Sequence, residues 1–175
     1  GWEQRAAVNI PYRLGSAPVA FDPSADKIYL GDETVQRSSD GGDNWDSLGE
    51  LGTARLRLVI DPADPQRMVV SAVDKPGKVL RSPDGGKTWK IALEGIEPGG
   101  WLAFDSSGAL IYPNPAGGGR YFRSVDGGAT WELLGESPPG NEARQLLFDP
   151  SDPQTVWSAG ECGGPLYRSQ DGGLT

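Results

Sequence analysis

The sequence of 175 residues contains no histidine, one cysteine and one methionine. Without histidine, the chain has no Ser-His-Asp or Cys-His catalytic set and none of the common histidine-containing zinc sites. The single cysteine, Cys162, excludes a disulfide within one chain. No histidine is present to activate it as a nucleophile, so we interpret Cys162 as incidental. A bridge between the Cys162 residues of two chains is the alternative.

Long apolar runs and an excess of positive charge are also missing. No stretch approaches 18 consecutive apolar residues, so the sequence predicts no membrane-spanning helix and no membrane insertion. Lys and Arg number 16 against 24 Asp and Glu, a net charge of −8. Nucleic acids are bound by clustered cations, so no nucleic-acid partner is expected. No phosphate loop, metal-ligand spacing or cofactor motif is present, so we expect no cofactor and no metal.

Glycine and proline are abundant, with 26 and 15 residues, whereas hydrophobic residues make up 37% of the chain. An eight-residue pattern, Ser-x-Asp-x-Gly-x-x-Trp, recurs with Asp-to-Asp steps of 44, 42 and 45 residues. A fixed period of this length indicates a repeat architecture. We divide the single domain 1–175 into repeats 2–44, 45–88, 89–130 and 131–175. The motif residues are Ser38, Asp40, Gly42 and Trp45; Ser82, Asp84, Gly86 and Trp89; Ser124, Asp126, Gly128 and Trp131; and Ser169, Asp171 and Gly173, a copy that stops one residue before its tryptophan.

Each repeat contains the same order of short strand-like segments and no helical periodicity. The first is an apolar run ending in aspartate, which we expect to be buried on both faces: 19–22, 58–61, 102–105 and 146–149. A turn rich in Pro and Asp leads to the second: 28–30, 68–70, 110–112 and 155–157. The third ends at the motif serine: 35–38, 79–82, 121–124 and 166–169. A fourth strand starts at the tryptophan. Four strands in about 43 residues form the unit of a β-propeller blade, so we predict an all-β propeller of four blades, each with four antiparallel strands.

The chemistry of the repeated turn favours a structural role. Its aspartate is an acceptor for backbone N–H groups of the turn, and its Gly-Gly pair supplies the positive φ that a tight hairpin needs. The tryptophan is expected to be buried between neighbouring blades, in the same way in each repeat.

This turn resembles the Asp-box, or bacterial neuraminidase repeat, and the resemblance extends over the whole chain. Similar repeats occur in sialidases, xyloglucan-active endoglucanases, sortilin-type receptors and a photosystem II assembly factor. The Asp-Pro-x-Asp-Pro turns of repeats two and four are most similar to the xyloglucanase group. The resemblance implies a propeller but no catalytic residue. Sialidases with such repeats have a tyrosine nucleophile, three arginines and an Arg-Ile-Pro segment, and the segment 10–13 of this chain does not match the last of these.

Two sets of residues are candidates for binding. Arg37, Arg81, Arg123 and Arg168 occupy the same place in each repeat, and we interpret them as partners of turn carboxylates or carbonyls, with an anion-binding ring as the alternative. Trp101 breaks the repeat pattern at the start of an innermost strand, where the other repeats have Pro18, Arg57 and Gln145. Innermost strands line the channel of a propeller, so Trp101, Arg57 and Gln145 are predicted to form a ligand site at its mouth. A structural plug of the channel is the alternative for Trp101.

The sequence therefore favours a non-catalytic, extracellular scaffold or recognition module with a carbohydrate or protein ligand and no catalytic residue. The alternative is a glycoside hydrolase, xyloglucanase-like, or a fragment of one, because such enzymes need only two facing carboxylates.

Trp2 matches the tryptophan that the fourth motif lacks, so the first residues are predicted to complete the last blade. Within one chain this closure forms a four-bladed ring; between two chains it forms an eight-bladed ring, and in an open series it forms a filament. Self-association is the favoured version.

Overall fold

The computed structural model describes residues 19–22, 26–31, 34–52, 56–72, 76–98, 100–105, 107–114, 119–136, 145–149, 151–159 and 165–174. Within these ranges the side chains of residues 145, 153 and 159 are not described. The predictions for Trp2, Pro18 and Cys162 lie outside the described residues.

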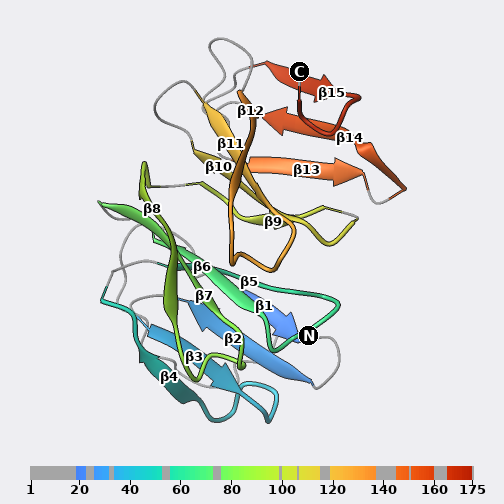
Figure 1. Cartoon of the computed structure of the whole chain (residues 1–175). Helices are drawn as coiled ribbons and strands as arrows, with labels where there is room; N and C mark the ends of the chain where they lie inside the picture. Colours follow the sequence, from blue (N-terminus) through green and yellow to red (C-terminus); the bar gives the residue numbers. More distant parts are fainter. Residues whose placement is uncertain are drawn as a thin grey trace.

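The described residues form four antiparallel sheets that follow one another along the chain (Figure 1). The first sheet contains β1 (Val19–Asp22), β2 (Lys27–Gly31), β3 (Thr34–Ser38) and β4 (Asp46–Glu50). The second contains β5 (Leu56–Ile60), β6 (Met68–Ala72), β7 (Gly77–Ser82) and β8 (Lys90–Ile96). The third contains β9 (Ala103–Phe104), β10 (Leu110–Asn114), β11 (Arg120–Ser124) and β12 (Glu132–Glu136). The fourth contains β13 (Gln145–Asp149), β14 (Asp152–Ala159) and β15 (Leu166–Ser169). The all-β, antiparallel prediction is confirmed.

Every sheet has the meander order expected from the repeat. Each strand pairs with the strand before it in the sequence, as in the register Val19↔Leu30 and Ile28↔Ser38 of the first sheet. The fourth strand begins one residue after the motif tryptophan, so each outer strand lies in the next sequence repeat. Glycine at positive φ makes the connecting turns possible, as at Gly127 (67°) and Gly128 (83°).

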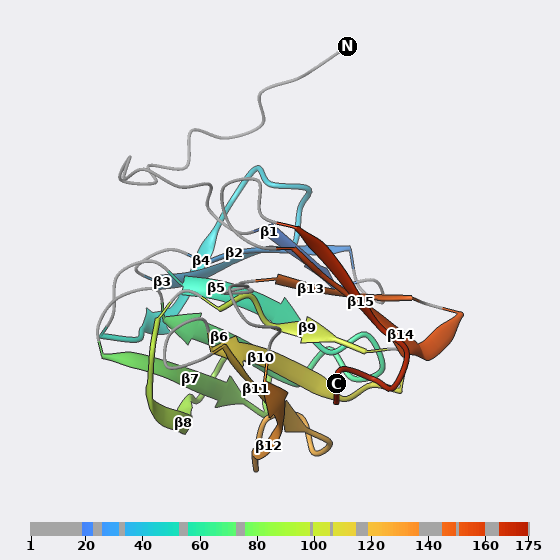
Figure 2. The same cartoon turned by 90° about the horizontal axis from the view of Figure 1, so that it is seen from above.

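Hydrophobic clusters join consecutive sheets. Tyr29 and Val35 of the first sheet pack with Leu58 and Met68 of the second, and alternate residues of the second sheet, such as Val69, face the third. A further cluster joins the third and fourth sheets through residues such as Ile111 and Val156. This alternation follows from the period of two in a strand, which directs successive side chains to opposite faces. In Figure 2, β8 and β12 lie at the periphery, whereas β5, β9 and β13 lie nearer the middle.

The described sheets do not form a closed ring, and the four-blade count stays a prediction. The expected fourth strand of the fourth sheet falls on the first residues, outside the described part of the chain. The expectation that the innermost strands are buried on both faces is wrong at the two end sheets. Val19 and Phe21 are 53% and 66% exposed, and Leu147 is 61% exposed. Each end sheet has a packed neighbour on only one face, so its other face is uncovered.

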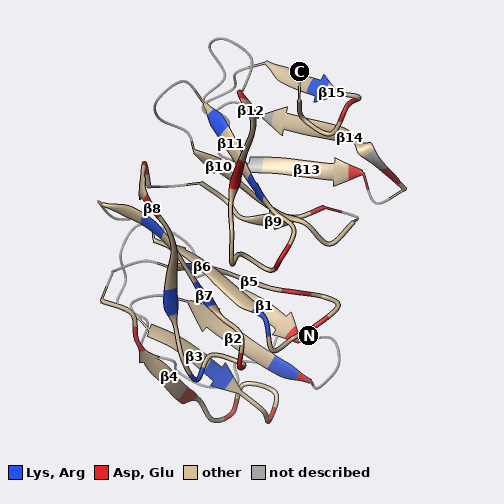
Figure 3. Cartoon of the chain, in the orientation of Figure 1, with Lys and Arg blue, Asp and Glu red and all other residues tan. Residues whose placement is uncertain are grey.

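Charged side chains are distributed over all four sheets (Figure 3). Within the described ranges, no helix has the length and apolar character needed to cross a membrane.

Candidate functional site

The four repeated turns, here called the Ser-x-Asp turns, share one hydrogen-bond pattern. In the first, the Ser38 hydroxyl donates to Asp40 Oδ1 (2.8 Å) and accepts from the buried Gly42 N–H (2.9 Å). Asp40 Oδ1 also accepts from the backbone N–H groups of Asp43 (3.1 Å) and Asn44 (2.9 Å). The prediction that the aspartates hold their own turns is confirmed. The second role of the serine, as acceptor for glycine N–H, was not predicted.

The same bonds recur in the other turns. Gly86, Gly128 and Gly173 donate their N–H groups to the hydroxyls of Ser82, Ser124 and Ser169 at 2.8, 2.8 and 3.0 Å. The aspartates Asp84, Asp126 and Asp171 accept from the backbone N–H groups of Thr88 (2.9 Å), Thr130 (2.9 Å) and Leu174 (3.0 Å). The motif therefore has the geometry of a turn clamp.

These bonds change the acidity of the turn carboxyls. The backbone N–H and side-chain amide of Asn44 lower the pKa of Asp40 to about 2. The hydroxyl and backbone N–H of Thr88 lower the pKa of Asp84 to about 2. For Asp126, burial opposes the change, yet the bonds from Thr130 and Ser124 still lower the pKa to about 2. Each carboxylate is held ionised by donors of its own turn, which makes it a poor proton donor or acceptor near neutral pH.

The motif tryptophans are equivalent in bonding but only half-buried, which corrects the expectation of full burial. The indole Nε1 of Trp45, Trp89 and Trp131 donates to the carbonyl of the motif glycine at 3.0, 3.0 and 3.2 Å. This bond folds each ring back over its own turn. Trp89 packs against the cluster between the first and second sheets, and Trp131 packs against the cluster between the second and third sheets.

The periodic arginines serve their sheets in different ways. Arg37 Nη2 lies 3.3 Å from Asp46 Oδ2, and Arg123 Nη2 lies 3.8 Å from Asp105 Oδ2. The guanidinium of Arg168 lies 5.7 Å from the ring centre of Trp157. Arg37 and Arg123 therefore pair with carboxylates, as interpreted from the sequence, whereas Arg168 lies beside an aromatic ring.

Arg57 and Trp101 come together between the second and third sheets. The guanidinium carbon of Arg57 lies 4.0 Å from the centroid of the Trp101 ring, a close cation–π stack. Arg57 is on β5, and Trp101 precedes β9 by two residues, so the innermost strand starts later than predicted. Trp101 remains 37% exposed. The predicted third member, Gln145, begins β13, and its side chain is not described.

The segment before Trp101 is fixed by buried groups of the third sheet. The Tyr112 hydroxyl donates to the Glu97 carbonyl (2.8 Å), and the Glu97 N–H donates to Asn114 Oδ1 (2.9 Å). Burial raises the pKa of Tyr112 to about 12. A Cβ on Gly100 would lie 1.9 Å from the Pro113 carbonyl oxygen, so only glycine fits there. The Gly-Gly pair at 99–100 is visible in the sequence. The contacts of Tyr112 and Asn114 with Glu97 join residues far apart along the chain, and no local sequence pattern predicts them.

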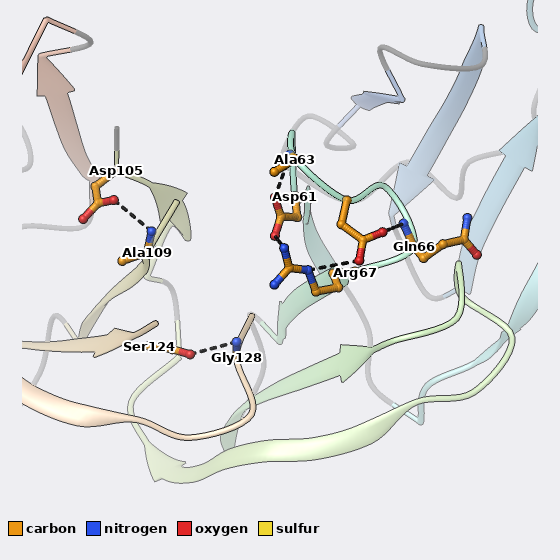
Figure 4. A network of polar contacts seen from close by, with 9 residues as sticks. Asp61, Ala63, Gln66, Arg67, Asp105, Ala109, Ser124 and Gly128 are labelled. Carbon is orange, nitrogen blue, oxygen red and sulfur yellow. Dashed lines mark hydrogen bonds and ion pairs between the residues drawn. The ribbon is translucent and has the colours of Figure 1, made fainter. Parts of the chain in front are cut away.

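A second network, which sequence reasoning missed, lies in the β5–β6 turn (Figure 4). Arg67 Nη2 lies 2.8 Å from the buried carboxylate of Asp61, and Arg67 Nε lies 3.3 Å from Asp64 Oδ2. The Arg67 side chain also lies against Gly127 in the turn of the third sheet. Arg67 therefore links the second and third sheets, while its charge is paired with two carboxylates of its own turn.

A groove of about 510 Å³ lies between the third and fourth sheets, and carboxylates line it. Asp105 accepts from the Ser107 hydroxyl (2.6 Å) and from the Ala109 N–H (2.8 Å), while Asp171 is held by Ser169 (2.5 Å). Glu132 Oε1 lies 4.0 Å from Arg123 Nη1. Two of these three carboxylates thus hold turns. Among the described residues, no group of three or more His, Cys, Asp or Glu is arranged to hold a metal ion.

The chain resembles known proteins in structure more than in sequence. No protein-family model matches the chain. An uncharacterized membrane glycoprotein of Saccharomyces cerevisiae is 32% identical over 71 residues, which are 41% of this chain and 16% of that protein. An ancestral GH74 enzyme is similar in structure, with a TM-score of 0.72 and 23% identity over 90% of this chain and 24% of the enzyme. The GH74 xyloglucanase of Xanthomonas campestris has a TM-score of 0.65 and 22% identity over 90% of this chain and 29% of the enzyme.

A chain of the nidogen/laminin complex is also similar, with a TM-score of 0.64 and 15% identity over 87% of this chain and 58% of that chain. The chain has a β-propeller fold. It spans about a quarter of the GH74 enzymes' length and about a sixth of the yeast glycoprotein's length. The likeness to these structures is one of fold, since proteins with this fold have unrelated activities.

Proposed function

We propose that the chain is a non-catalytic recognition module of Asp-box type, which binds its ligand on the Arg57–Trp101 stack. The observation that carries the proposal is an exposed aromatic ring held by a cation at 4.0 Å on a segment fixed by Tyr112 and Asn114. A ring held in this way presents a flat apolar face without having to become ordered when a ligand arrives. A carbohydrate ring is the ligand class that suits best the face of the indole that Arg57 does not cover.

The carboxylates support the non-catalytic assignment. Asp105 and Asp171, which line the groove, are engaged by donors of their own turns. A glycoside hydrolase uses two carboxyls as acid and as base or nucleophile across the scissile bond. Carboxylates that hold turns would have to break those bonds to act in this way. We place the module outside the cell, where polysaccharide and matrix-protein ligands occur.

Calorimetric titration with xyloglucan oligosaccharides tests the proposal. We expect binding by the native chain, loss of binding in Trp101→Ala and partial binding in Trp101→Phe, which keeps an aromatic face. Leu133→Ala is the matched control, because Leu133 is an exposed apolar residue (56%) on β12. Equal binding by Trp101→Ala and the native chain would contradict the assignment.

A xyloglucanase-like hydrolase, or part of one, is the second candidate, because two GH74 enzymes share the fold. It is tested by incubating the chain with xyloglucan and with sialosides. We expect no product. Turnover that disappears when a single Asp or Glu is replaced would establish the hydrolase in place of the recognition module.

A further inference from the structure

Arg81, the periodic arginine of the second sheet, lies opposite another cation. In the first and third sheets the residue opposite the periodic arginine on the outer strand is acidic: Asp46 opposite Arg37, and Glu132 opposite Arg123. In the second sheet the residue opposite Arg81 is Lys90. Like charges directly opposite each other on two strands repel, so this pair does not stabilise its sheet as the pairs of the neighbouring sheets do.

The carboxylate of the innermost strand is engaged by a different residue. In the third sheet the periodic arginine lies 3.8 Å from Asp105, the aspartate that ends the apolar run. The equivalent aspartate of the second sheet is Asp61, and Arg67 Nη2 lies 2.8 Å from its Oδ2. The side chains of Arg81 and Lys90 have no hydrogen bond or ion pair with any described residue. Within the described part of the chain, these two adjacent cations therefore have no counter-ion.

The hairpin that contains this pair is the basic part of an acidic chain. Its ten residues from 81 to 90 include three cations and one carboxylate: Arg81, Lys87, Lys90 and Asp84. The equivalent spans 37–46 and 123–132 have one arginine each, against three and two carboxylates. Four of the five lysines of the chain fall between residues 75 and 90. In Figure 3, β7 and β8 both carry blue segments. Positive charge is therefore concentrated on this hairpin, although the chain has a net charge of −8.

The cations of the hairpin are accessible, and its carboxylate is bound by other groups. Asp84 Oδ1 accepts from the Ser82 hydroxyl (2.8 Å), and its Oδ2 accepts from the Thr88 hydroxyl (2.6 Å). The side chains of the two lysines are exposed, and that of Arg81 is half-buried. An anion from outside the chain can therefore approach the cations.

The geometry of Arg81 and Lys90 suits a carboxylate. The planar guanidinium of Arg81 can donate two parallel hydrogen bonds to the two oxygens of a carboxylate, while the Lys90 ammonium acts as a point charge. The Cβ atoms of directly opposite residues are about 4.5–5.5 Å apart, so both side chains can reach one anion.

The surroundings of the pair favour an acidic polysaccharide as the source of that carboxylate. Between residues 81 and 90 no large apolar side chain is exposed, and protein partners are usually anchored by such side chains. A nucleic acid has a dense series of negative charges, which the 24 Asp and Glu of this chain would repel. A polysaccharide in which every second sugar is a uronic acid has widely spaced carboxylates, so one of them can reach the hairpin without bringing many others near the acidic surface.

We propose that Arg81 and Lys90 form a second ligand site, which binds the carboxylate of a uronic acid residue in an acidic polysaccharide, with Lys87 beside it. The bound carboxylate takes the place of the acidic residue that the first and third sheets have at the equivalent position. The site is separate from the stack on Trp101, because Arg57 is on the innermost strand of the second sheet and Lys90 is on its outermost strand.

Calorimetric titration with a hyaluronan hexasaccharide at low ionic strength tests the site, because every second sugar of this probe carries a carboxylate. We expect binding by the native chain and none of a neutral hexasaccharide of N-acetylglucosamine. Lys90→Gln is expected to weaken binding by about tenfold, the effect of losing one charge-assisted contact. Lys78→Gln is the matched control, since it removes the same charge from the same hairpin, but Lys78 is opposite Glu94. It is expected to bind as the native chain does.

Lys90→Glu tests the vacancy for a carboxylate directly. It places an acidic side chain opposite Arg81, as in the third sheet, so we expect it to abolish binding of the probe while Tm stays the same or rises. A native chain that does not bind the probe would overturn the proposal, as would equal losses in Lys78→Gln and Lys90→Gln or a lower Tm of Lys90→Glu. A hexapeptide of glutamate that binds as tightly would show that the site does not select a polysaccharide.

The two ligand sites are distinguished by exchanging the variants. Trp101→Ala is expected to keep its binding of the hyaluronan probe, and Lys90→Glu is expected to keep its binding of xyloglucan oligosaccharides. Loss of hyaluronan binding in Trp101→Ala would contradict a second site. Failure of xyloglucan binding in the native chain would count against the proposed function alone.

Discussion

Replacing Ser38 by alanine removes the acceptor for a buried backbone N–H. The Ser38 side chain is 1% exposed, and its hydroxyl accepts from the Gly42 N–H at 2.9 Å and donates to Asp40 at 2.8 Å. Leaving a buried donor without its acceptor costs about 1–3 kcal/mol. We therefore expect Ser38→Ala to lower the free energy of unfolding by about 2 kcal/mol. In a chain of this size, that corresponds to a fall in Tm of about 4–8 °C.

Ser39→Ala is the control for this prediction, because Ser39 is the next residue of the same turn and its side chain is exposed. An exposed substitution of this kind changes stability by no more than about 0.5 kcal/mol. Guanidinium unfolding of the two variants, analysed with a common slope, measures the difference directly. If Ser38→Ala and Ser39→Ala were equally stable, the turn clamp would not contribute to the stability of the fold.

Three further predictions follow from the described groups. Asp40 and Asp84 have pKa values of about 2, below the unfolded value of about 4. The stability that these two carboxylates contribute to the fold is present above pH 4 and is lost as the pH falls toward 2, so Tm should decrease across this window. A constant Tm between pH 4 and pH 2 would refute the role of these carboxylates in holding their turns. Gly100→Ala should destabilise the fold by about 1–3 kcal/mol and weaken ligand binding at Trp101, because its Cβ would collide with the Pro113 carbonyl. A neutral effect in both unfolding and titration would contradict it. Burial raises the pKa of Tyr112 to about 12, so its contribution to the stability of the fold is complete below about pH 10 and is lost as the pH rises toward 12. Tyr112→Phe should remove that part of the alkaline unfolding; an unchanged profile would argue against the burial.

The sheets could be predicted because each repeat carries its own turn chemistry and apolar runs. The segments 19–22 and 166–169 were predicted as strands and are β1 and β15. The fourth strand starts one residue after each tryptophan, a small shift that follows from the Nε1 bond folding the ring back on its turn. Local patterns specify these features because the bonds that form them span only a few residues.

The site was predicted only in part. The stack of Arg57 on Trp101 joins residues 44 positions apart, and the repeat placed them together. The contacts that fix Trp101 come from Tyr112 and Asn114, whose role depends on how β10 packs against the preceding loop. Burial at the two ends was mispredicted, since an apolar run such as 19–22 has the same pattern whether one face or both faces are covered. Which faces have a neighbour depends on how the sheets pack on one another and not on any single repeat.

The recognition role of Trp101 is tested by a crystal structure of the chain with a bound xyloglucan oligosaccharide. We expect an intact oligosaccharide with one sugar ring stacked on the face of Trp101 that Arg57 does not cover. A ligand bound only in the groove between the third and fourth sheets, or cleaved into products there, would contradict it.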